Sequence, residues 1–121
     1  LDTLDFLVVQ EMALTETAKR ADVVLPALSY AEKIGTMTNL ERCVQALRRA
    51  LTPLPGAKAD WEILRAVATR LGQPWSYRSP ADVLSEIAAK VPLYAGLTRE
   101  AIGDQGRRWS FADALAPATV R

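Results

Sequence analysis

The 121-residue sequence contains no histidine and a single cysteine, Cys43. Without histidine, the chain cannot use histidine-based acid–base catalysis or form the usual zinc sites. One cysteine excludes an internal disulfide and any cysteine-rich iron–sulfur site within these residues. These absences exclude histidine-based catalysis and any histidine- or cysteine-rich metal site.

A charge excess and a long apolar run are also absent. Fifteen basic residues face fourteen acidic ones, which leaves a formal charge of +1 and argues against a nucleic-acid arm or a basic membrane-binding patch. No apolar run approaches the roughly 20 residues that span a bilayer, and no signal pattern opens the chain. We expect a cytoplasmic protein with no nucleic-acid partner and no direct membrane insertion. Because the sequence starts at Leu1 close to a core-type strand, we also expect a fragment of a longer chain.

Two short apolar segments predict strands. "FLVV" at 6–9 and "DVVLP" at 22–26 are read as buried strands, and "ALTETAKRA" between them predicts a short helix capped by Thr15. The order strand, helix, strand is typical of a parallel α/β unit. Such a sheet binds ligands outside the carboxyl ends of its strands.

The second half of the chain shows helical patterns. Asp60 is placed to cap the helix "WEILRAVATRL", Ser79 to cap "PADVLSEIAAK", and Thr98 to start a shorter one. The stripe expected to face inward on the first helix consists of Trp61, Leu64, Val67, Ala68 and Leu71. The predicted fold class is α/β, a partial Rossmann-like parallel sheet unit followed by two or three amphipathic helices. We divide the single domain 1–121 into 1–51, a linker at 52–59 and a helical part at 60–121, with a loosely held tail from Ser110.

The segment between these halves is ambiguous. Leu40, Val44, Leu47 and Leu51 recur at helical spacing, so periodicity alone predicts a helix over 40–51 with Asn39 as its cap. Two acidic residues in this region, Glu32 and Glu41, flank a glycine turn. We interpret them as solvated or ion-paired surface groups.

Polar residues follow both predicted strands. Gln10 and Glu11 end the first strand, and Lys33 lies shortly after the second. A carboxylate at this edge can accept hydrogen bonds from ribose hydroxyls or from the N–H edge of guanine, and an ammonium group can meet a phosphate. These residues form a candidate nucleotide site, whereas a role as a helix cap is by itself a sufficient explanation of Asp60.

A longer pattern resembles a known family. The segment "DFLVVQEMALTETAKRADVVLPALSYAEKIGTMTNLERCVQ", followed by "PGAKADWEILRAVATRLG", resembles the molybdopterin oxidoreductase family over roughly residues 5–72. In relatives that carry bis-molybdopterin guanine dinucleotide, this region belongs to a Rossmann-like domain that binds one dinucleotide. The resemblance implies that residues 40–51 are mostly extended. It places Gln10, Glu11, Lys33 and Asp60 at cofactor-binding positions.

Departures from the family pattern favour one branch of the family. Glu11 stands in place of the usual aspartate, Ile34 and Met37 are apolar where many relatives are acidic or aromatic, and Cys43 replaces an arginine. We expect a structural carboxy-terminal fragment of the G subunit of NADH-quinone oxidoreductase, part of the electron-transfer arm of respiratory complex I. No cofactor is then expected here.

That interpretation carries further expectations. Iron–sulfur clusters would lie elsewhere in the parent chain, and the partners would be the rest of that chain and other subunits of a complex peripheral on the inner membrane. The alternative is a fragment of a molybdenum enzyme such as formate dehydrogenase, with molybdopterin guanine dinucleotide as its cofactor. A stand-alone nucleotide-binding or interaction module is a further alternative.

Overall fold

A computed structural model describes residues 1–109 and divides the chain into two compact units. Unit 1 combines Leu1–Lys33 with Arg49–Ser76, and unit 2 combines Ile34–Arg48 with the chain from Tyr77 onward. The units are interleaved along the chain, since each combines an earlier segment with a later one. The prediction of a loosely held tail from Ser110 lies outside the described residues.

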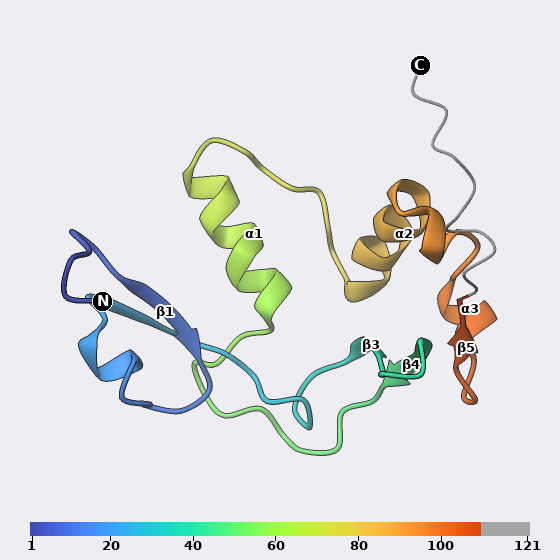
Figure 1. Ribbon diagram of the computed structural model, residues 1–121, viewed down its shortest axis with the longest axis horizontal. Helices are drawn as coiled ribbons and strands as arrows, with labels where there is room; N and C mark the ends of the chain where they lie inside the picture. The colour runs from blue at the N-terminus through green and yellow to red at the C-terminus, as the bar shows by residue number, and fades with distance from the viewer. Residues whose placement is uncertain (110–121) are drawn as a thin grey trace. The chain divides into compact units, whose positions relative to one another are not determined.

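Unit 1 contains a parallel pair of strands, as predicted. Strand β1 (Val8–Glu11) pairs with β2 (Val23–Pro26) so that Val8 lies opposite Val23 and Gln10 opposite Leu25. The short 3-10 helix η1 (Ala18–Arg20) connects them, and the backbone N–H of Ala18 donates to the hydroxyl of Thr15. Figure 1 shows β1 in this unit, with the helical turn following it along the chain. The strand–helix–strand prediction is confirmed.

A third stretch of chain lies beside the end of β2. Ala27 and Lys58 form a parallel bridge, in which Lys58 N–H donates to the carbonyl of Pro26 and Leu28 N–H donates to that of Lys58. Helix α1 (Asp60–Arg70) begins two residues after Lys58. Because all three stretches run in the same direction, the carboxyl ends of β1 and β2 and the start of α1 lie at one edge of the sheet.

Both strands are more exposed than predicted. Val8 is 48% exposed and Val23 is 38% exposed, although the sequence indicates strands buried on both faces. A parallel sheet is normally covered on both sides by helices. Within residues 1–109, the two-stranded sheet of unit 1 keeps the face shared by these two valines open to solvent.

Helix α1 turns a different side inward from the one predicted. Ile63, which is outside the predicted stripe, is buried, whereas Leu64 within the stripe is 51% exposed; Ala68 is buried as predicted. Asp60 is the first helical residue rather than the cap, a position held by Ala59. The side chain of Asp60 is held at the sheet edge by two hydrogen bonds. Because Ile63 lies one turn after Asp60 on the same face, that attachment directs Ile63 inward and leaves much of the apolar stripe outside.

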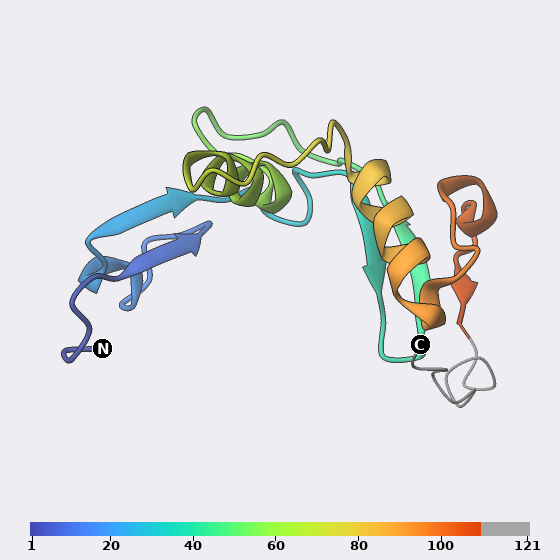
Figure 2. The same ribbon diagram turned by 90° about the horizontal axis from the view of Figure 1, so that it is seen from above.

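Unit 2 is built on an antiparallel sheet. Strand β3 (Gly35–Thr38) pairs with β4 (Cys43–Leu47), which also pairs with the two-residue strand β5 (Arg107–Arg108). Figure 2 shows helix α2 (Pro80–Lys90) running alongside β3 and β4. The rest of the unit includes the 3-10 helix η2 (Pro92–Tyr94) and the short helix α3 (Arg99–Ile102). The buried core consists of Val44, Leu84, Leu97 and Ile102.

The helix that periodicity predicts over 40–51 is a strand instead, in agreement with the extended conformation implied by the family resemblance. The side chain of Asn39 accepts hydrogen bonds from the backbone N–H groups of Glu41 and Cys43, both at 3.0 Å, and so closes a turn. Arg42 completes this turn with a left-handed φ of 65°. These local bonds compete with helical hydrogen bonds and reverse the chain direction, which places β4 beside β3.

The helices of unit 2 begin where the sequence predicts. Ser79 caps α2 by accepting a hydrogen bond from the backbone N–H of Asp82, whose carboxylate accepts one from Ser79 N–H. Pro80 is the first helical residue, and Thr98 caps α3 through the N–H of Ala101. Throughout residues 1–109, every helix is too short or too polar to cross a membrane.

Candidate functional site

Asp60 joins two distant parts of unit 1 at the carboxyl edge of the sheet. One carboxylate oxygen, Oδ1, accepts a hydrogen bond of 2.7 Å from the Nε2 of Gln10 at the end of β1. The other, Oδ2, accepts from the Nζ of Lys33, which follows β2, and forms an ion pair with it. Three of the four predicted site residues therefore meet in one hydrogen-bonded cluster.

The charge state of Asp60 follows from these contacts. Partial burial by itself raises the pKa of this carboxyl, but the hydrogen bond and charge of Lys33, together with the hydrogen bond of Gln10, outweigh it and hold the pKa below its ordinary value. The side chain of Asp60 remains 46% exposed and that of Lys33 26%. The cluster thus presents an ionised, partly accessible carboxylate beside a cation.

Glu11, the fourth predicted residue, does not join this cluster. Its Oε1 accepts a hydrogen bond of 2.8 Å from the backbone N–H of Met12, which turns the carboxylate back onto the chain that follows β1. Glu11 alternates with Gln10 along the strand, so the two side chains point to opposite faces of the sheet. The geometry separates Glu11 from Asp60 rather than pairing them.

Glu32 has a role that sequence reasoning misses. Its side chain is not a solvated surface group: the residue is 8% exposed, and its carboxylate accepts hydrogen bonds from the backbone N–H groups of Ser29 and Leu54. Those bonds, first from Ser29 and then from Leu54, hold its pKa below the usual value. The spacing of Ser29 and Glu32 is that of a capping box, which could have indicated the contact. Glu41, in contrast, pairs with Arg108 on the surface, as expected.

The remaining chemistry of the described part of the chain is limited. Residues 1–109 contain no group of three or more potential metal-ligating side chains. Cys43 lies in β4, and its sulfur faces the backbone of Gly106. The cluster of Gln10, Lys33 and Asp60 is therefore a candidate binding site rather than a catalytic or metal site. Its side chains offer hydrogen bonds and charge, but no nucleophile and no set of metal ligands.

Comparison with protein families gives a match over the segments that form this edge. Residues 1–70, which include β1, β2 and α1, match the family model described as molybdopterin oxidoreductase. This match covers more than half of the chain and contains every residue of the cluster. The chain belongs to the molybdopterin oxidoreductase family.

Curated relatives extend the match to the second half of the chain. A protein named "Putative formate dehydrogenase" from Staphylococcus aureus strain USA300 is 48% identical over 109 residues, which is 89% of this chain and 11% of that protein. A protein of the same name from Staphylococcus haemolyticus is 46% identical over 113 residues, or 93% of this chain and 12% of that protein. The chain thus spans about a ninth of the length of these relatives. Their names favour the formate dehydrogenase alternative over the complex I subunit.

Proposed function

We propose that this chain is part of a formate dehydrogenase-like molybdopterin oxidoreductase and that its unit 1 contributes to binding a molybdopterin guanine dinucleotide. When bound, the molybdenum carried by the pterin groups of such a cofactor would supply the electron-transfer chemistry. The residues of this chain would hold the nucleotide end. The partners are then the rest of the parent chain and any further subunits that pass electrons on.

The observation that carries the proposal is the placement of Asp60. Its carboxylate lies at the carboxyl edge of a parallel sheet, where α/β folds bind nucleotides. The N–H groups at the edge of guanine are donors and need acceptors. The carboxylate of Asp60 accepts hydrogen bonds from Gln10, from Lys33 and from its own backbone N–H. A carboxylate has about four acceptor sites and this side chain is 46% exposed, so it can accept from guanine as well.

Lys33 and Gln10 fit the same ligand in different ways. The ammonium group of Lys33 neutralises part of the charge of Asp60 and provides a cation for a phosphate or a ribose hydroxyl. The amide of Gln10 uses its N–H to hold Asp60, which leaves its carbonyl oxygen as an acceptor. The donor set thus suits a neutral base edge and an anionic phosphate, and it lacks the soft ligands that select a transition metal.

The test is to substitute the cluster in the full-length protein. Asp60→Asn and Lys33→Ala should each lower the guanine nucleotide retained after purification, which is measured as GMP released by acid hydrolysis. We expect about a tenfold loss or more, because removing one hydrogen bond to a charged group costs about 1.5–3 kcal/mol. Lys58→Ala is the matched control, since Lys58 lies two residues before Asp60 and is exposed. Unchanged GMP in both cluster variants would contradict the proposal.

A further inference from the structure

Glu32 links two loops of unit 1 directly beside the proposed cofactor site. Its Oε2 accepts a hydrogen bond of 2.9 Å from Ser29 N–H, and its Oε1 accepts one of 3.0 Å from Leu54 N–H. These two donors lie on segments separated by more than twenty residues. One buried carboxylate therefore joins the loop after β2 to the loop before α1.

The backbone around Glu32 strengthens this link. The carbonyl of Glu32 accepts a hydrogen bond of 3.0 Å from the Nε of Arg49. The carbonyl of Ala31 accepts two more, from the N–H groups of Ala50 at 2.8 Å and Leu51 at 2.9 Å. Together with the bond from Leu54, these contacts hold Ala31 and Glu32 of the loop after β2 against the loop before α1.

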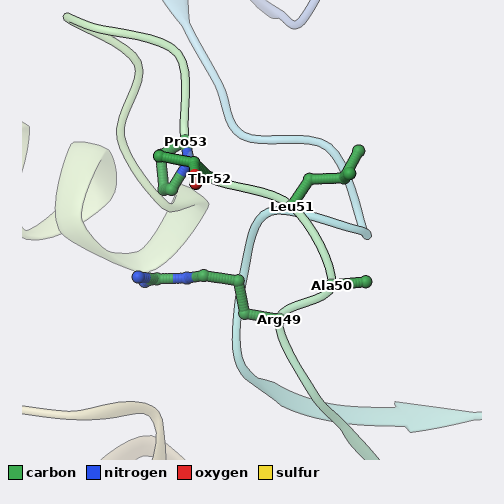
Figure 3. A pocket seen from close by; sticks show the side chains of 5 residues that line it. All are labelled: Arg49, Ala50, Leu51, Thr52 and Pro53. Atoms are coloured by element: carbon green, nitrogen blue, oxygen red, sulfur yellow. The ribbon is translucent and has the colours of Figure 1, made fainter.

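Figure 3 shows how the second loop is arranged. The side chain of Arg49 extends away from those of Ala50 and Leu51. The five residues Arg49–Pro53 line a hollow of about 240 Å³. Arg49 binds the carbonyl of Glu32 through its Nε, and its terminal nitrogens extend beyond that contact.

The hydrogen bonds of Glu32 that join the two loops, here called the Glu32 clamp, lie directly beside Lys33, and this position gives the clamp a function. Lys33 is the next residue after Glu32, and its long side chain has to cross to the first turn of α1 to reach Asp60. A lysine side chain has several rotatable bonds and loses much conformational freedom when its end is fixed. Fixing the backbone immediately before it lowers the additional cost of holding the ammonium group in place.

We propose that Glu32 is a positioning residue, which clamps the two loops and so holds Lys33 on Asp60. It does not contact the cofactor; it acts through Lys33. The proposal rests on the function proposed above, because a positioned Lys33 matters only if the site binds a ligand. The clamp itself can be measured without any cofactor.

The test measures the reactivity of Lys33 in the full-length protein, expressed in a host that cannot make molybdopterin. The acetylation rates of Lys33 and of the exposed Lys58 are measured by mass spectrometry in the same digest. The rate of Lys33 divided by that of Lys58 is low when Lys33 is firmly held and rises when it is released. Glu32→Gln keeps the shape of the side chain but turns an N–H₂ group toward one of the two N–H donors. We expect this ratio to rise about twofold or more. Residues in one hydrogen-bond network stabilise one another, and a twofold change corresponds to the lower end of the interaction energies measured for such residues.

Controls separate the clamp from general loosening. Glu16→Gln removes a carboxylate that pairs with Lys19 on the surface of the same unit and should leave the ratio unchanged. Arg49→Gln removes the donor to the Glu32 carbonyl and should raise the ratio by a smaller amount, which keeps the test usable if Glu32→Gln fails to fold. An unchanged ratio in the folded variants would overturn the inference. Unchanged GMP retention in Lys33→Ala would instead contradict only the proposed function.

Discussion

Lys33 and Asp60 form an ion pair although 27 residues separate them in the sequence. The pair connects the loop after β2 to the first turn of α1, and Gln10 joins it from the end of β1. The carboxylate is shared between two donors, so each contact restrains the other. Because the side chains are partly exposed, we expect the pair to act mainly by orienting groups and to add little to overall stability.

The first prediction concerns the ionisation of Asp60. Lys33→Ala should raise the pKa of this carboxyl toward its ordinary value, because the hydrogen bond and charge that lower it are removed. A carboxyl whose pKa is lowered on folding contributes stability above its unfolded pKa and loses it as pH falls through the folded value. The variant should therefore lose less stability on acidification. A carbon-13 carboxyl titration measures the pKa, with Lys58→Ala as the control; identical titrations for wild type and Lys33→Ala would contradict the ion pair.

The second prediction tests which face of α1 is buried. Ile63→Ala should destabilise the chain by about 2–5 kcal/mol, as large-to-small changes at buried sites do. Ile63 is 6% exposed, whereas its neighbour Leu64 is 51% exposed. Leu64→Ala should therefore cost about 1 kcal/mol or less. Chemical denaturation of both variants gives the comparison, and a larger loss for Leu64→Ala would restore the face predicted from periodicity.

The third prediction concerns close packing at Gly106. A Cβ at this position would lie 2.7 Å from the sulfur of Cys43, and the backbone φ is 76°. Gly106→Ala should thus carry both the backbone strain, about 1–2 kcal/mol, and an overpacking cost of about 1–3 kcal/mol. Gly56 also has a positive φ, of 86°, but open space around it, so Gly56→Ala carries the strain alone. Equal thermal shifts for the two variants would show that β5 does not pack closely on β4.

The fourth prediction concerns the turn between β3 and β4. Asn39→Ala removes the acceptor for two backbone N–H groups and should lower stability by about 1–2 kcal/mol. Asn39→Asp retains a side-chain oxygen at the same place and should recover most of that loss. Hydrogen exchange of the Glu41 and Cys43 amides checks the local effect. Exchange that is equally slow in wild type and Asn39→Ala would show that the turn does not depend on this side chain.

The elements and part of the site can be predicted from the sequence, for reasons visible in particular residues. Short apolar runs ending at Gln10 and Pro26, and the caps at Ser79 and Thr98, are local signals, and the structure follows them. The antiparallel sheet is harder to predict. Residues 40–47 have apolar groups at helical spacing, but the turn bonds of Asn39 and the pairing of β4 with β3 and β5 hold this segment extended.

The predicted burial of Leu64 and the predicted surface position of Glu32 are wrong because burial depends on tertiary contacts. The most apolar stripe of α1 includes Leu64, yet the attachment of Asp60 to Gln10 turns Ile63 inward instead. Sequence alone indicates a surface position for Glu32, because its second partner lies 22 residues away in the following loop. Neither contact leaves a periodic signal in the sequence. Strand-end placement predicts that Gln10 and Lys33 lie at one edge of the sheet, whereas the family resemblance alone adds Asp60 to them.

The most direct test of the central claim is the cofactor content of the full-length protein. The protein is purified after expression with molybdate, molybdenum is measured by mass spectrometry, and GMP is measured after acid hydrolysis. We predict that both are present in stoichiometric proportion, as a molybdopterin guanine dinucleotide enzyme requires. A correctly folded protein that contains neither would contradict the proposed function and support the structural role expected of the complex I subunit.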